Sequence, residues 1–148
     1  MASINESENP GEGVGANSFV VGDIAGFLTP LDEALFSDFL KLASYLYSEG
    51  YKDAAAVVCI GVLEAHLRKL SEKLEIVVTD DNGLPKKADA LNGELAARGA
   101  YARLDEENVS AWLGLRNNAG HEENARSARD DVAFLLEGVR SLLDRYPV

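Results

Sequence analysis

The chain has little of what exported or membrane-spanning proteins need. Its 148 residues include one cysteine, which excludes an internal disulfide and suits a reducing compartment. Residues 1–30 lack the basic start and apolar core of a signal peptide, and no later apolar run approaches the roughly 18 residues of a membrane helix. These absences predict a cytoplasmic protein that does not enter a membrane.

Positive charge is also scarce. Lysine and arginine number 14 against 25 aspartates and glutamates, and the formal net charge is −11. Affinity for phosphate backbones comes from basic patches, so the composition argues against indiscriminate binding to nucleic acids or anionic membranes. Any nucleic-acid site must be local. Arg103, Arg116, Arg126 and Arg129 do gather in one stretch, although acidic residues lie among them as on an ordinary solvated face.

Familiar catalytic and cofactor motifs are missing as well. The sequence has no glycine-rich phosphate loop, paired-cysteine metal site, serine nucleophile elbow or internal repeat. The turn at 80–83 lacks the alternating oxygen ligands of a calcium loop. Cys59 stands in the apolar run 54–63 and is expected to pack as a small hydrophobe. We therefore expect no metal and no cofactor.

Composition divides the chain into two regions. Residues 1–30 are acidic, rich in glycine and without a basic residue, which predicts a flexible N-terminal arm. Two apolar segments, 19–21 and 24–28, are suited to dock that arm on the rest of the protein. Residues 31–148 are long enough for one hydrophobic core and predict a single domain.

Apolar residues three and four positions apart predict a mostly α-helical bundle. Gly50 and Gly99 are placed to end two of the helices, whereas Asp105 and Ser127 are placed to cap the start of two others. Between the second and third helices, β-prone residues and turn residues over 76–85 predict a small hairpin or an ordered loop. The expected helices span 31–50, 52–74, 88–98, 105–116 and 127–146, the second being central.

Arg116 and His121 form the most informative pair, at the seam between the last two predicted helices. Arg116 continues an apolar stripe with Val109, Trp112 and Leu113. A guanidinium in such a stripe needs an anion to offset its desolvation. Histidine is the one side chain whose unperturbed pKa straddles neutral pH. The pair therefore predicts an anion clamp beside a group that transfers protons.

The predicted central helix carries a second polar motif. Glu64 and Arg68 have the spacing and order of a favourable helix ion pair. This pair either supports the seam or is a surface salt bridge with no further role. His66, the only other histidine, lies at the edge of the apolar stripe and is interpreted as a packing or surface residue.

These residues resemble a known family. The motif Arg116-Asn117-x-x-x-His121 before a final amphipathic helix, with Glu64-x-x-x-Arg68 on a long second helix, resembles the HEPN superfamily of small helical domains. In that family an arginine precedes a histidine by four to six residues, usually with a polar residue after the arginine. The resemblance predicts a HEPN-like bundle of about four to five helices with a small hairpin or loop insertion.

The resemblance covers residues 31–146 and is most specific over 111–121, which is similar to the small stand-alone bacterial members. Two residues depart from that pattern. Gly120 and Glu122 flank the histidine where those relatives commonly carry alanine and glycine. Glu122 therefore places a carboxylate beside the histidine, where it would either raise the pKa of His121 or repel an RNA phosphate.

The resemblance implies a metal-independent endoribonuclease whose active cleft lies at a homodimer interface. Arg116 would hold the phosphate and His121 would transfer protons. Asn117 would orient either the histidine or the phosphate. Glu64 and Arg68 would form a supporting shell. A toxin or defence role, with an antitoxin or nucleotidyltransferase partner, belongs to the same expectation. Arg126 and Arg129, which follow the motif in the sequence, would bind the RNA.

Other interpretations of the motif stay open. Arg116 could bond to carbonyls at the end of its helix while His121 caps the next segment, with no substrate involved. The domain could also be a catalytically silent HEPN-like module that binds a nucleotide, an RNA or a protein. A plain helical adaptor would neither bind such a ligand nor cleave RNA.

Overall fold

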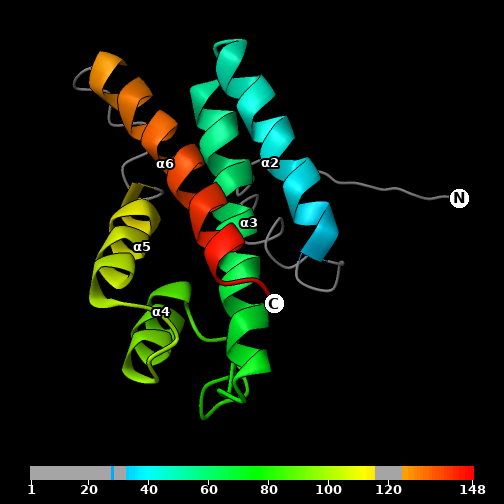
Figure 1. The fold of residues 1–148 in the computed structure, drawn as a ribbon, viewed down its shortest axis with the longest axis vertical. Coiled ribbons are helices and arrows are strands. Elements are labelled where there is room, and N and C mark those ends of the chain that lie inside the picture. The colour runs from blue at the N-terminus through cyan, green and yellow to red at the C-terminus, as the bar shows by residue number, and fades with distance from the viewer. Residues whose placement is uncertain (1–27, 29–32, 116–124) are drawn as a thin grey trace, which may run out of the picture.

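The computed structural model describes residue 28, residues 33–115 and residues 125–148, with the backbone alone for 125–129. Within these ranges the chain forms an all-α bundle, as predicted (Figure 1). The expected arm over 1–30 lies outside the described residues except for Leu28, which is fully buried. No helix in the described ranges is long and apolar enough to cross a membrane. The helices are α2 (Glu33–Ser48), α3 (Lys52–Lys73), α4 (Ala88–Ala97), α5 (Arg103–Leu115) and α6 (Ala125–Arg145).

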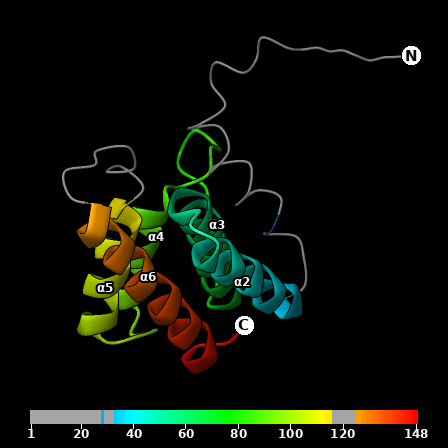
Figure 2. The same ribbon diagram turned by 90° about the horizontal axis from the view of Figure 1, so that it is seen from above.

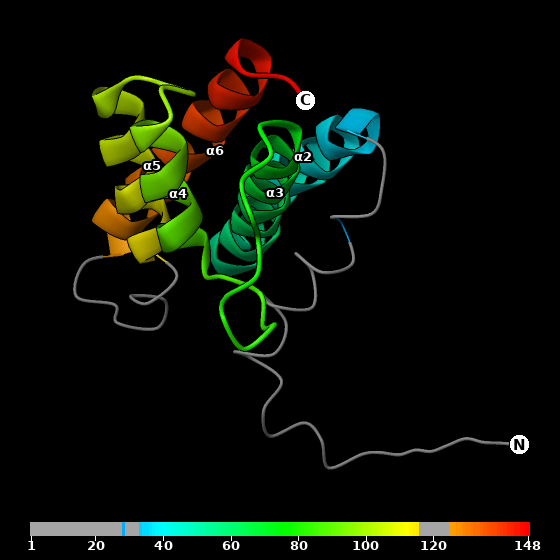
Figure 3. The same ribbon diagram turned by 90° about the horizontal axis from the view of Figure 1, so that it is seen from below.

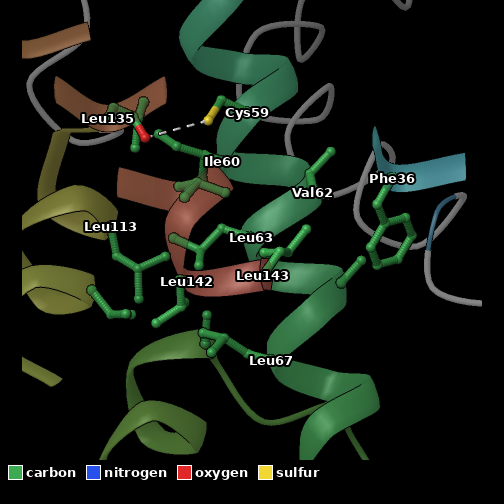
Figure 4. Packing of buried hydrophobic residues seen from close by; sticks show 14 of the residues in the cluster. Phe36, Cys59, Ile60, Val62, Leu63, Leu67, Leu113, Leu135, Leu142 and Leu143 are labelled. Carbon is green, nitrogen blue, oxygen red and sulfur yellow. Dashed lines mark hydrogen bonds between the residues drawn. The ribbon is translucent and has the colours of Figure 1, made fainter. Parts of the chain in front are cut away.

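Helix α3 is the central element, as its apolar spacing predicts. It contacts α2, α4 and α6, and it lies between α2 and the α4–α5 pair when the bundle is seen from above (Figure 2). Every residue from Cys59 to Leu67 is buried. Leu113 of α5 and Leu135 and Leu142 of α6 belong to the same core as the leucines of α3 (Figure 4). Each fully buried leucine contributes roughly 1.5–3 kcal/mol.

Two predicted helix ends are confirmed and two predicted caps are wrong. Gly50 and Gly99 follow α2 and α4 with positive φ of 94° and 77°, a conformation that glycine adopts without strain. Helix α5 begins at Arg103, ahead of Asp105, whose carboxylate instead bonds to side chains at the end of α6. Helix α6 begins at Ala125, ahead of Ser127, because alanine and arginine are good helix formers and extend the first turn.

The connection between α3 and α4 is the predicted ordered loop (Figure 3). One antiparallel β-bridge joins Thr79 to Pro85. The Oδ1 atom of Asp80 accepts the backbone N–H groups of Asn82 at 2.9 Å and Leu84 at 3.0 Å, which closes the turn. One aspartate and one bridge define the turn of this loop, which carries no extended strand ladder.

Helices α5 and α6 meet at an unusually close contact between Trp112 and Gly138. A Cβ atom built on Gly138 would lie 2.1 Å from Cζ2 of the indole ring. Real side chains do not approach so closely, so the ring sits directly against the backbone of α6. Glycine at position 138 sets how near the two helices lie.

We predict that Gly138→Ala destabilises the protein. The added methyl group would overlap the indole of Trp112, and such overpacking costs about 1–3 kcal/mol. Thermal unfolding followed by circular dichroism measures the loss. Gly93→Ala in α4 is the matched control, since no atom lies within 4 Å of its Cβ position and alanine there should stabilise the helix by about 0.5–1 kcal/mol. Equal stability of Gly138→Ala and wild type would contradict the packing of the indole on α6.

Candidate functional site

The predicted catalytic residues Arg116, Asn117 and His121 lie in residues 116–124, outside the described part of the chain. So do the two departures from the family pattern, Gly120 and Glu122. What the structure places is the pair of helices on either side. Helix α5 ends one residue before the motif, and α6 begins directly after residue 124.

Both flanking helices are anchored in the core. On α5, Val109 is fully buried and Leu113 is 1% exposed, which confirms the predicted stripe as far as the last described turn. Trp112 fills the space against Gly138. On α6 the predicted stripe is also confirmed: its buried members are Val132, Leu135, Leu136, Val139, Leu142 and Leu143. The motif therefore lies in the sequence between two helices that both pack into the core.

Glu64 and Arg68 lie one turn apart on α3, as predicted, but they are not a surface salt bridge. Glu64 is only 7% exposed. Arg68 reaches the α3–α4 loop, where its guanidinium donates a hydrogen bond to the carbonyl of Lys86. Arg68 thus holds that loop against the central helix, and the carboxylate of Glu64 lies within the bundle.

The three other arginines near the motif differ in what the structure shows. Arg126 and Arg129 lie on the first two turns of α6, and their side chains are outside the described residues. Arg103 pairs with Glu107 at 3.2 Å, and these side chains are 87% and 60% exposed. That pair is an ordinary solvated contact on the surface of α5.

His66 packs inside the bundle, as one of its two interpretations predicts. Its side chain is fully buried. The Nδ1 atom lies 2.9 Å from Oε2 of Glu33, the first residue of α2, and the Nε2 atom lies 2.9 Å from the carbonyl oxygen of Tyr146. A ring enclosed in this way is not available to a substrate.

Sequence reasoning missed a polar cluster that joins α4, α5 and the end of α6. Asp105 is 6% exposed and accepts hydrogen bonds from Tyr146 Oη at 2.8 Å and from Arg145 Nη1. The rings of Tyr101 and Tyr146 lie 5.7 Å apart, and the hydroxyl of Tyr101 donates to the side-chain oxygen of Asn92. The amide of Asn92 bonds in turn to the backbone of α5. These groups satisfy one another, so the cluster holds helices together.

Both tyrosines of this cluster remain protonated hydrogen-bond donors. Burial, followed by the nearby carboxylates of Glu106 and Asp105, raises the pKa of Tyr101 well above its usual range. The hydrogen bond to Asp105 is the main reason that the pKa of Tyr146 is also raised. No sequence signal links these residues, because Asp105 and Tyr146 are 41 positions apart.

An open hollow of about 280 Å³ lies between α2 and α6. Ser44 of α2 accepts a hydrogen bond of 3.3 Å from Arg140 of α6 across it, and Phe134, 69% exposed, forms part of its wall. Over the described residues, no group of three or more histidine, cysteine or acidic side chains is arranged to hold a metal ion.

No protein-family model, curated protein or solved structure matches this chain. The candidate site accordingly rests on the motif and on the helices that flank it.

The one thiol of the chain is predicted to be inert in the folded protein. Burial raises the pKa of Cys59 to about 12, only partly opposed by Arg140, and Sγ lies 3.9 Å from the carbonyl oxygen of Leu135 (Figure 4). At about pH 8 only about one thiol in ten thousand would be the reactive thiolate. Native protein should therefore not react with a disulfide reagent such as DTNB, whereas protein unfolded in urea should release one equivalent of chromophore. Rapid labelling of the native chain would show that Cys59 is accessible.

Proposed function

We propose that the protein is a metal-independent endoribonuclease that acts as a homodimer. The observation that supports this proposal is the order Arg116-Asn117-x-x-x-His121 in the short connection between α5 and α6. Trp112 and Leu113 pack in the last described turns of α5, shortly before Arg116 in the sequence. A preorganised cation and a proton-transferring group are what phosphodiester cleavage needs.

The reaction is transesterification within the RNA chain. A base removes the proton of a ribose 2′-hydroxyl, whose oxygen attacks the adjacent phosphorus. The bond from phosphorus to the 5′-oxygen of the next nucleotide breaks, and an acid protonates that oxygen. The products are a 2′,3′-cyclic phosphate and a 5′-hydroxyl end. In this scheme Arg116 binds the phosphate oxygens in the charged transition state, and Asn117 orients the phosphate or the histidine.

Dimerisation follows from the proton balance. One step takes a proton and another gives one, and each chain offers a single histidine in the motif. An isologous interface repeats every residue across its two-fold axis, so a dimer brings a second copy of His121 to the cleft. In this proposal Arg126 and Arg129, at the start of α6, bind the RNA strand, and Glu64 and Arg68 support the motif. A toxin or defence role would add an antitoxin or nucleotidyltransferase partner.

Two observations favour a second candidate, a catalytically silent module that binds RNA, a nucleotide or a protein. The formal net charge of −11 disfavours a polyanionic substrate outside the immediate site. Glu122 adds a negative charge directly after His121. A silent module would bind its ligand and dimerise without producing new RNA ends.

We predict that the purified protein cleaves single-stranded or loop RNA, and that Arg116→Ala and His121→Ala each lower the rate by at least about 100-fold. The proposed chemistry uses an arginine and histidines, so EDTA should leave the rate unchanged. Two imidazoles that share the acid and base steps should give a bell-shaped pH profile. The rate is measured on labelled RNA, and the end groups are identified by mass spectrometry.

Arg103→Ala is the control for this experiment, since Arg103 forms only a solvated pair with Glu107 in the described structure. It should cleave like wild type. The circular dichroism spectra of all variants should agree, and wild type should sediment as a dimer at micromolar concentration. If wild type leaves a panel of RNAs uncleaved but still binds a ligand, the result would favour the silent module instead.

We also predict that Glu64→Gln lowers cleavage more than it lowers stability. The substitution keeps the shape of a side chain that is 7% exposed but removes its charge, which a supporting role would need. Melting temperature and cleavage rate are compared in the same buffer. Glu72→Gln, at an exposed position of the same helix, is the matched control and should change neither quantity. A Glu64→Gln variant that melts earlier but cleaves normally would show that Glu64 serves only the fold.

A further inference from the structure

The most exposed large apolar side chain in the described ranges stands at the edge of the hollow between α2 and α6. Phe134 is 69% exposed and lines this hollow of about 280 Å³ together with Tyr47 and Leu136. A single apolar residue on a surface is ordinary. Here a projecting aromatic ring and an open space with apolar walls lie next to each other. The hollow and its edge form the α2–α6 face.

The α2–α6 face also carries one cation and one anion that do not pair with each other. Arg140 and Glu137 both line the hollow and lie three residues apart on α6. Among the contacts of the described residues, Arg140 donates only to the neutral hydroxyl of Ser44, at 3.3 Å, and the carboxylate of Glu137 has no partner. Each charged group is therefore open to an opposite charge from another molecule.

A molecule that covers this face must match four features at once. It must accept the ring of Phe134, fill the hollow, bring an anion to Arg140 and bring a cation to Glu137. A second copy of the chain has all four, because an isologous interface repeats every group across its two-fold axis. Aromatic residues and arginine are also the side chains in which such interfaces are enriched. The face is thus complementary to itself.

We propose that two copies of the chain associate through the α2–α6 face. The ring of Phe134 enters the hollow of the second copy, and Glu137 pairs with Arg140 of the second copy, each contact being made twice. The formal net charge of −11 repels two copies at a distance, so apolar contact and these local pairs must hold them together. This inference assigns a face to the proposed homodimer but does not rest on RNA cleavage.

Sedimentation velocity of the full chain over a concentration series measures the dissociation constant of the dimer. Phe134→Asp should raise this constant by at least about 30-fold, the loss expected for an aromatic anchor at the centre of an interface. Leu104→Asp is the matched control, because Leu104 is 67% exposed on α5 and lies outside the hollow. It should dimerise like wild type. A monomeric wild type, a Phe134→Asp variant that still dimerises normally, or loss of the dimer in Leu104→Asp alone would overturn the proposal.

Charge reversal supplies the second test. Arg140→Glu and Glu137→Arg each oppose like charges across the interface, so each variant alone should raise the dissociation constant by at least about 10-fold. An equimolar mixture of the two should recover association as heterodimers, because a chain with two acidic groups then meets a chain with two basic groups at both pairs. Native mass spectrometry identifies the heterodimers. A mixture that associates no better than its components would refute the pairing. No RNA is present, so these results hold whether or not the chain cleaves RNA.

Discussion

Burial of the central helix on all sides is the constraint from which the rest of the structure follows. Because every residue from Cys59 to Leu67 is inside, other elements must cover α3 around its whole circumference. Any polar group on this stretch must then find its partner on another element, since water cannot supply one. His66 meets this condition with Glu33 of α2 and the carbonyl of Tyr146 after α6. Through His66, the central helix is therefore in contact with both the start of α2 and the residue that follows α6.

Tyr146 contacts residues from several elements at once. Its carbonyl accepts from His66, its hydroxyl donates to Asp105, and its ring packs against Tyr101. The guanidinium of Arg145 lies 5.2 Å from the centre of the same ring. Hydrogen bonds in such a network reinforce one another in a low-dielectric interior. The end of α6 is therefore held to both α3 and α5.

This arrangement gives the seam between α5 and α6 a rigid frame. Asp105 joins the first turn of α5 to the end of α6, and Trp112 joins the last turns of α5 to Gly138. Two separate contacts along the same pair of helices fix their spacing and their relative tilt. The motif on which the proposed function rests lies in the sequence between these two helices.

The sequence by itself determined the all-α class, the central place of α3 and the ends of α2 and α4. Periodic apolar residues and glycines at helix ends are local signals, and a local signal fixes a local conformation. It also placed Arg116, Asn117 and His121 in one short stretch, because their separation along the chain is a property of the sequence. Tertiary structure decided the roles of Asp105, Glu64 and His66. Asp105 looks like a cap, Glu64 like a surface ion pair and His66 like a simple packing residue until α2, α5 and the end of α6 come together around them. The partners of Asp105 and His66 are distant in sequence, and only the packing of the helices determines which polar groups lose water and must bond to each other.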